Sequence, residues 1–304
     1  MQAPKRRESP ASRPWLWALG GAAVVIAIAA IVGVALTRSD GGARTPTSNE
    51  SAELPTGLPE TADYHSLSVN PSNPNRLLLG THDGLYSSAD GGKSWQSEGL
   101  DGQDAMNLAR VGGQTVWTAG HNVFAKSTDG GKTWVNVSPT GLPSLDLHGF
   151  AVDPRNPKRL YAAVAGQGLF RSDDGGRSFG PVSSRVGGAV MALAVTPAGA
   201  ILAGDMQQGL LVSRDGGMTW RRVLRAPLMG LAVNPRDPTR VLAAGEGILL
   251  STNGGRTWRQ RLLLTDGAGP VAWSQSNPRV AYVVSFDRTL YRSSDGGKSW
   301  SAVA

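Results

Sequence analysis

The octet Ser293-Ser294-Asp295-Gly296-Gly297-Lys298-Ser299-Trp300 is the last of six related stretches in the chain. The earlier copies span residues 88–95, 127–134, 172–179, 213–220 and 251–258, and the aromatic residues that close successive copies are 39, 45, 41, 38 and 42 residues apart. A period near 40 residues is typical of supersecondary units that stack and share a core. The octet therefore predicts a repeat architecture for most of the chain.

Each part of the octet has a physical role in a tight connection between antiparallel strands. The Gly-Gly pair permits positive φ, and the Asp accepts hydrogen bonds from the amides of its own turn. The closing aromatic ring is too large for one hairpin to bury, so neighbouring units must pack around it. These structural roles fall to Asp90, Trp95, Asp129, Trp134, Asp174, Phe179, Asp215, Trp220, Asn253, Trp258, Asp295 and Trp300.

With these octets the chain resembles the Asp-box (sialidase/BNR) repeat family, whose pattern is Ser/Thr-x-Asp-x-Gly-x-Thr-Trp, and its sortilin-like, photosystem assembly factor-like and glycosyl hydrolase-like bacterial members. The resemblance covers roughly residues 62–304 and implies an all-β propeller of four-stranded blades, with each box between the third and fourth strands. Six complete units predict six blades, and seven is the alternative if the preceding segment adds strands. Because such propellers include glycosidases, receptors and assembly factors, the fold alone does not select a function.

The amino-terminal segment is predicted to anchor the propeller to a membrane. Residues 1–14 carry four basic residues and one acidic residue, and residues 15–37 form an uncharged apolar run long enough to span a bilayer. A cleavable signal peptide has a shorter apolar region, so an uncleaved single-pass anchor is favoured. The basic tail places the amino terminus in the cytoplasm and the rest outside. Residues 38–61, rich in Ser, Thr, Pro and Gly, read as a flexible linker to a propeller over 62–304.

Composition narrows the function classes. The chain has no Cys, which excludes disulfides, thiolate metal sites and lipoprotein attachment. The net charge of +7 is concentrated partly in the basic tail, and no run of basic residues interleaved with aromatic residues follows. Nucleic acid is therefore not an expected partner.

One face of the predicted propeller gathers unusual residues. The connections from second to third strands and the starts of the first strands share this face, which we call the top. All four His and four Met of the chain fall there, at His65, Met106, His148, Met191, Met229, His82, His121 and Met206. Imidazole and thioether are soft neutral ligands that suit copper, above all Cu(I). The alternative is that Met fills an irregular channel and that His at turn tips is ordinary polar surface.

A glycoside hydrolase needs a pair of carboxylates about 5–9.5 Å apart. Candidates in the top-face turns are Asp83, Asp205, Glu246 and Asp287, with Asp101, Asp104, Asp146 and Asp266 on the connections between blades. Sialidase activity is not expected, because the Arg-Ile-Pro stretch of sialidases is missing near the start and the top face offers few arginines for a carboxylate-binding triad, namely Arg185, Arg225 and Arg288.

Three functions stay open at this point. The first is a membrane-anchored binding or assembly module for another envelope protein or a glycan, which predicts an apolar or charged patch on the top face and no turnover. The second is metal binding, with copper the first candidate. The third is a glycoside hydrolase of non-sialidase type.

Overall fold

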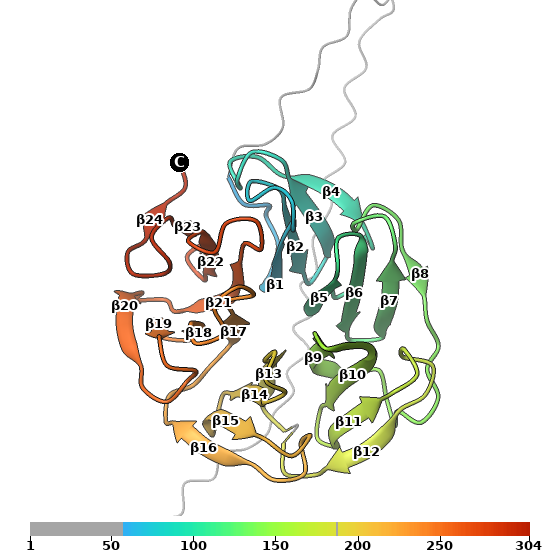
Figure 1. Cartoon of the computed structure of the whole chain (residues 1–304). Coiled ribbons are helices and arrows are strands. Elements are labelled where there is room, and N and C mark those ends of the chain that lie inside the picture. Colours follow the sequence, from blue (N-terminus) through green and yellow to red (C-terminus); the bar gives the residue numbers. More distant parts are fainter. Residues whose placement is uncertain (1–56, 187) are drawn as a thin grey trace, which may run out of the picture. The chain divides into compact units, whose positions relative to one another are not determined.

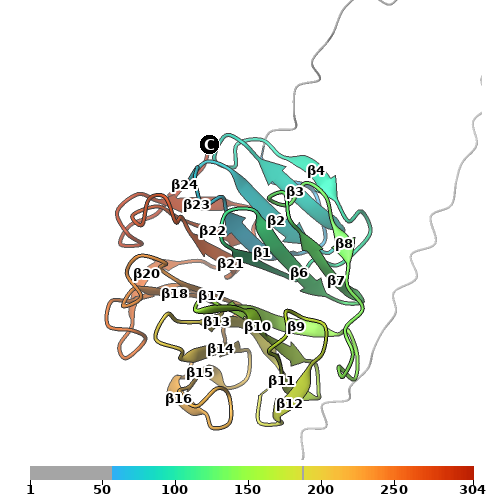
Figure 2. The same cartoon turned by 45° about the vertical axis from the view of Figure 1, so that its right-hand side comes forward.

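The computed structural model describes residues 57–186 and 188–304, which form a ring of six four-stranded antiparallel sheets (Figures 1 and 2). The prediction of an all-β propeller with six blades is confirmed. The predicted tail, the apolar run 15–37 and most of the linker lie outside the described residues. Within the described residues, no helix has the length and apolar character needed to cross a membrane.

Each blade is built from four consecutive strands, paired in sequence order. Blades 1 and 2 are β1 (Tyr64–Val69), β2 (Leu77–Thr81), β3 (Gly84–Ser88), β4 (Gln96–Gly99), and β5 (Asn107–Val111), β6 (Thr115–Gly120), β7 (Val123–Ser127), β8 (Val135–Asn136). Blades 3 and 4 are β9 (Leu147–Asp153), β10 (Asn156–Val164), β11 (Gly168–Ser172), β12 (Gly180–Ser183), and β13 (Val190–Val195), β14 (Ile201–Asp205), β15 (Gly209–Ser213), β16 (Arg221–Leu224). Blades 5 and 6 are β17 (Gly230–Val233), β18 (Val241–Ala244), β19 (Gly247–Ser251), β20 (Arg259–Leu263), and β21 (Ala268–Trp273), β22 (Ala281–Ser285), β23 (Leu290–Ser293), β24 (Ser301–Ala302).

Burial follows strand position in the blade. The first strand of each blade lies nearest the centre of the ring and the fourth lies at the perimeter (Figure 1). Residues of all six first strands line the central channel. Second strands are buried on both faces, as in β2 and β22, and consist of apolar runs. Fourth strands are exposed, and their residues are mostly polar or charged. The first strands are therefore the elements that present side chains to the channel.

Each box closes its turn through a small hydrogen-bond network. In the first copy, Ser88 Oγ accepts from the Gly92 amide at 2.8 Å and donates to Asp90 Oδ1 at 2.8 Å. Asp90 Oδ1 also accepts from the amides of Lys93 and Ser94. The fifth copy keeps the same pattern with Asn253. The network is local in sequence, which explains why the same octet recurs in every blade.

The boxes and the turns between first and second strands lie on one face, which we call the bottom. In blade 1 the Gly91 amide donates to Asn75 O at 2.8 Å, and the second, third, fifth and sixth boxes make the same bond to residues 114, 158, 239 and 279. In blade 3 this turn is short. β10 already begins at Asn156, because this residue pairs with Asp153. The top face is consequently left to the other connections.

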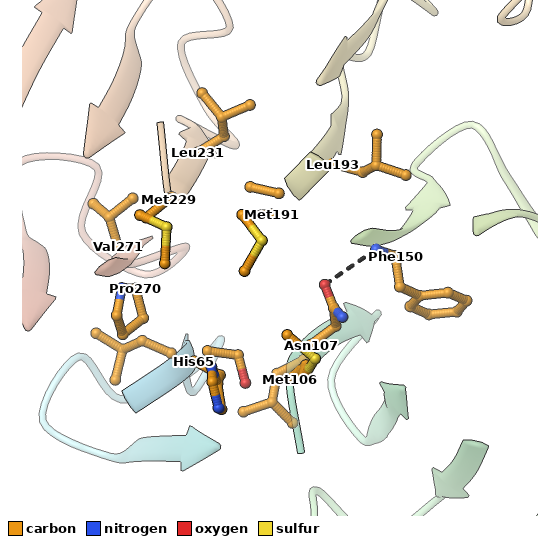
Figure 3. Close-up of a pocket in the computed structure, with 15 residues that line it drawn as sticks. His65, Met106, Asn107, Phe150, Met191, Leu193, Met229, Leu231, Pro270 and Val271 are labelled. Atoms are coloured by element: carbon orange, nitrogen blue, oxygen red, sulfur yellow. Dashed lines mark hydrogen bonds between the residues drawn. The ribbon is translucent and has the colours of Figure 1, made fainter. Parts of the chain in front are cut away.

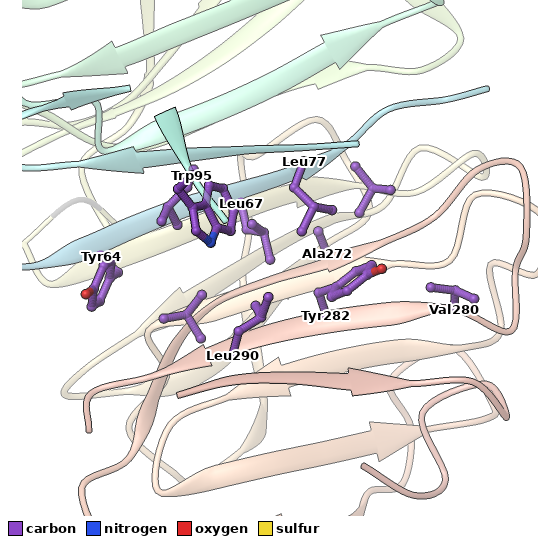
Figure 4. Close-up of a cluster of buried hydrophobic side chains, with 11 residues drawn as sticks. Tyr64, Leu67, Leu77, Trp95, Ala272, Val280, Tyr282 and Leu290 are labelled. Carbon is purple, nitrogen blue, oxygen red and sulfur yellow. The ribbon is translucent and has the colours of Figure 1, made fainter. Parts of the chain in front are cut away.

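The ring closes without strand exchange, because blade 1 and blade 6 are each made from consecutive strands. Buried side chains hold this seam: Trp95 and Leu77 of blade 1 face Tyr282 and Leu290 of blade 6 (Figure 4). The closing aromatic residues contribute unequally across the ring. Trp95 and Phe179 are buried, whereas Trp134 lies in none of the buried apolar clusters of the described residues.

Candidate functional site

Short connections place the predicted top-face residues. His82 and His121 lie on the turns β2–β3 and β6–β7, and Met206 lies on β14–β15. Met106 and Met229 immediately precede β5 and β17. His65, His148 and Met191 are the second residues of β1, β9 and β13. All eight therefore belong to the top face, where they contribute to three groups that share His65 and Met229.

Irregularities in strand pairing set the direction of several of these side chains. Pairing of β1 with β2 passes from Tyr64 to Ser66, so His65 is an extra residue opposite no partner. Equivalent shifts at the start of β9 and β13 fall at His148 and Met191. A bulge inserts one residue and bends the strand, which re-aims the side chain. Three of the predicted ligands thus owe their direction to bulges at the channel mouth.

The first group lines the channel mouth. His65, Met106, Met191 and Met229 surround a small cavity of about 80 Å³, together with apolar residues such as Val271 (Figure 3). The thioethers of Met191 and Met229 point into the opening in this view. His148 does not line this cavity, so the predicted ring of His and Met is interrupted at blade 3.

The second group brings all four histidines together with two aspartates. Asp104, on the β4–β5 connection, is buried and lies between three imidazoles: His65 Nε2 is 3.4 Å from its Oδ1, and His82 Nδ1 and His121 Nδ1 are 3.2 and 2.6 Å from its Oδ2. Burial lowers the pKa of His65, although the Asp104 carboxylate opposes this shift. His65 is consequently expected to be neutral at pH 7.

His121 extends this cluster into blade 3. Its Nε2 lies 3.0 Å from His148 Nε2 and 3.0 Å from Asp146 Oδ1, and the last two atoms are also 3.0 Å apart. From the sequence, Asp104 and Asp146 were predicted only as candidate glycosidase carboxylates on the connections between blades, not as partners of the histidines. Asp146 stands two residues before His148, an Asp-x-His spacing that offered a signal for their meeting. The donor set here is imidazole with carboxylate, whereas thioethers gather at the channel mouth. The predicted copper site stays a prediction.

The predicted catalytic carboxylates are engaged in local structure. Asp205 is buried and its Oδ1 accepts from the amides of Gln207 and Gln208 at 2.8 Å. A hydrogen bond from the Ser285 hydroxyl lowers the pKa of Asp287. Asp83 accepts from the Thr61 hydroxyl at 2.8 Å. A general acid needs a raised pKa, and Asp287 shows the opposite.

Glu246 and Met206 belong to a third group, an apolar groove over blades 4 to 6. The groove encloses about 600 Å³ and is lined by Met206, Pro227, Met229, Leu263, Phe286 and neighbouring residues, with Glu246 and Asp266 as its ionisable groups. Of the five exposed large apolar residues in the described part of the chain, three lie here: Met206, Leu263 and Phe286. Leu263 and Phe286 were not predicted as site residues, because a single apolar residue at a strand end or in a turn forms no recognisable sequence pattern.

Comparisons with known proteins agree with this fold. The profile of a family described as "Photosynthesis system II assembly factor YCF48" matches residues 58–303. No curated protein sequence matches the chain.

Solved structures with the same fold include both enzymes and binding proteins. A GH74 xyloglucanase from Xanthomonas campestris is 19% identical, with a TM-score of 0.58 over 83% of this chain and 46% of that chain. YCF48 bound to D1 peptide is 20% identical, with a TM-score of 0.51 over 82% of this chain and 83% of that chain. YCF48 from Cyanidioschyzon merolae is 19% identical, with a TM-score of 0.50 and coverages of 82% and 87%. The chain spans less than half the length of the GH74 enzymes that it resembles. At these identities the likeness shows the fold alone.

Proposed function

The chain belongs to the photosynthesis system II assembly factor YCF48 family, and we propose that it is a binding or assembly module that holds an extended segment of another envelope protein on its top face. The observation that carries this proposal is the groove over blades 4 to 6, where three exposed apolar side chains gather. Contiguous exposed apolar surface on a soluble domain marks an interaction site. A YCF48 structure with a bound D1 peptide supports the choice of a peptide as the ligand.

The groove also indicates the chemistry of its partner. Its ionisable side chains, Glu246 and Asp266, are both acidic. A segment with apolar residues beside a Lys or Arg would complement them, because opposite charges across an interface favour the correct register and disfavour acidic competitors. We therefore expect apolar-basic segments to bind and apolar-acidic segments to be rejected.

Fluorescence polarisation with labelled peptides tests this function. The full chain in detergent is titrated into apolar-basic, apolar-acidic and polar peptides of equal length. The apolar-basic set is expected to bind, and Phe286→Ser or Leu263→Ser is expected to weaken binding at least tenfold. Met218→Ser is the control, because Met218 is also an exposed apolar residue but lies within the fourth box on the bottom face. Equal binding of all three sets, or equal loss in Met218→Ser, would refute the proposal.

The proposal includes a membrane anchor at residues 15–37, with residues 1–14 in the cytoplasm and the propeller outside. The uncharged apolar run and the basic tail before it support this arrangement. A reporter enzyme that is active only outside the cytoplasm, fused after Ala304, is expected to be active in cells. Deletion of 15–37 should abolish that activity.

A glycoside hydrolase is the less supported alternative. Its support is the shared fold with GH74 enzymes, and the chain covers less than half of their length. Asp205 and Asp287, two of the four predicted carboxylates, are occupied by hydrogen bonds within their own turns. Release of reducing ends from xyloglucan, lost in Glu246→Gln, would favour the enzyme over the binding module.

A further inference from the structure

We propose that His121, Asp146 and His148 form a binding site for one divalent first-row transition metal ion, with Asp104 as the carboxylate that positions His121. The three ligands come from the β6–β7 turn and from the start of blade 3. The site is independent of the apolar groove, which lies over blades 4 to 6. It also differs from the copper site expected from the sequence, because carboxylate replaces thioether in the donor set.

The separations of the donor atoms fit one ion. His121 Nε2, His148 Nε2 and Asp146 Oδ1 form a triangle with three sides of 3.0 Å. Two ligands bound at about 2.1 Å and at right angles to each other lie about 3.0 Å apart. The three atoms therefore match one face of an octahedron. A triad of two His and one carboxylate in this arrangement leaves the opposite coordination positions open.

The tautomer of His121 leaves a lone pair on Nε2, the atom that forms one corner of this triangle. Asp104 Oδ2 lies 2.6 Å from His121 Nδ1, and a carboxylate can only accept, so Nδ1 donates the proton. In neutral His121 the other ring atom, Nε2, then carries a lone pair. Carboxylate–histidine pairs of this kind orient the imidazole ligands of metal ions. The pair supplies the same orientation here.

The triangle holds more acceptors than protons. With His121 Nε2 as an acceptor and Asp146 Oδ1 as a carboxylate oxygen, one proton on His148 Nε2 cannot satisfy both. Asp146 Oδ1 is buried and has no hydrogen-bond partner among the described residues. A buried acceptor without a partner is costly. A cation at the centre of the octahedron, above the plane of this face, would satisfy all three atoms.

The backbone around the ligands is fixed before any ion arrives. His121 and Asp146 form an isolated antiparallel bridge, and the Asn122 amide donates to Leu145 O at 2.9 Å. Asp146 O in turn accepts from the Ala165 amide of the neighbouring turn at 2.9 Å. Ligands held on such rigid elements need little rearrangement to bind. The His121 and Asp146 side chains are 42% and 45% exposed, so the site lies at the surface although the Asp146 Oδ1 atom itself is covered.

The donor types select the class of ion. Imidazole suits Zn, Cu, Fe and Ni, whereas Mg and Ca prefer all-oxygen sites. Three protein ligands with open positions are typical of sites that also bind a small molecule or a partner's side chain. Zn²⁺ and Co²⁺ are therefore the appropriate probes.

The test uses the full chain without a polyhistidine tag, treated with a chelator and then titrated with Zn²⁺ in competition with a chromophoric chelator. We expect one Zn²⁺ per chain, and a loss of affinity of at least 100-fold in His148→Ala and in Asp146→Asn. Asp101→Asn is the matched control for Asp146→Asn, because Asp101 is an exposed aspartate that accepts from the Ser97 hydroxyl and lies outside the triangle. Its affinity is expected to stay within about threefold of the wild type.

A second readout separates lost ligands from lost folding. Circular dichroism melting compares each variant in the absence of metal, and Zn²⁺ should raise the melting temperature of the wild type and of Asp101→Asn but not of Asp146→Asn. The Co²⁺ absorption spectrum of His148→Ala is compared with that of the wild type, provided that melting shows the variant to be folded. A change in coordination is then expected. Failure of the wild type to bind Zn²⁺ or Co²⁺, or an equal loss in Asp101→Asn, would overturn the site.

Discussion

Asp104 Oδ2 lies 2.6 Å from His121 Nδ1, so a buried carboxylate of one interblade connection orients an imidazole of the next blade. Replacing this carboxylate tests its positioning role, because Asp104 is outside the triangle of proposed ligands. We expect Asp104→Asn to weaken Zn²⁺ binding by about 10–100-fold, the usual effect of losing such a partner. That loss should be smaller than the loss in His148→Ala.

Asp101→Asn is the control for Asp104→Asn. Asp101 lies on the same connection and accepts from the Ser97 hydroxyl at 2.8 Å, away from the histidines. Chelator competition should give it wild-type affinity. If both variants bind Zn²⁺ like the wild type, Asp104 does not position His121 for a metal.

Asn107 is a second residue on which the cluster depends. Its Nδ2 donates to Leu147 O at 2.9 Å, and its Oδ1 accepts from the Phe150 amide at 3.1 Å (Figure 3). Asn107 therefore bonds to the β9 backbone on both sides of His148. Asn107→Ala leaves two buried backbone groups without partners, at about 1–3 kcal/mol each. We expect a loss of about 2–4 kcal/mol in urea unfolding, together with weaker Zn²⁺ binding.

Asn136→Ala provides the comparison, because Asn136 is exposed on β8. Its effect on stability should stay within about 0.5 kcal/mol. Equal stability of the two variants would show that the hydrogen bonds from Asn107 to β9 contribute little to the free energy of unfolding.

The fold could be predicted from the octet because each box is local. Ser88, Asp90 and Ser94 close their turn within eight residues of sequence, and the same bonds recur wherever the octet recurs. The position of the histidines on the top face followed from counting strands. Both inferences depend on spacing along the chain.

The grouping of the site could not be predicted in the same way. Bulges at His65 and His148 decide which way these side chains point, and the octets carry no information about them. The meeting of Asp104 with His121 joins residues of different connections across blades 1 and 2. Such contacts depend on how far each connection extends over its neighbour, which a repeat alignment leaves open.

Gly92 packs against the neighbouring blade at the closing seam. Its φ is +95°, and an added Cβ would collide with Cδ2 of Leu290. Gly91 has a similar φ of +84° but has only ordinary contacts around an added Cβ. We expect Gly91→Ala to lower the free energy of unfolding by about 1–2 kcal/mol through backbone strain. Gly92→Ala should lower it by a further amount of about 1–3 kcal/mol through overpacking.

Urea unfolding of the two glycine variants measures this difference directly. Because both variants share the strain of positive φ, the excess in Gly92→Ala reports the seam. Equal destabilisation of the two would mean that Leu290 moves aside without cost, and that the seam between blades 1 and 6 is loosely packed.

Acid should weaken the propeller through its boxes. Burial alone would raise the pKa of Asp90, but hydrogen bonds from Ser94, Ser88 and two backbone amides lower it to about 2. The unfolded chain takes up this proton near pH 4. The stability that Asp90 contributes is therefore complete above about pH 4 and is lost as the pH falls toward 2.

The fifth box supplies the control for this pH dependence, because Asn253 has no titrating group: its Oδ1 accepts the same amide bonds, and its Nδ2 donates to the Thr257 hydroxyl. We expect Asp90→Asn to melt below the wild type at pH 7 and to approach it at pH 2, since the variant no longer loses this contribution. Asn253→Asp should do the reverse and add acid sensitivity. Melting temperatures of the three proteins at pH 7, 4 and 2 measure both effects. Parallel curves at all three pH values would show that the box carboxylates stabilise their turns no better when ionised than when protonated.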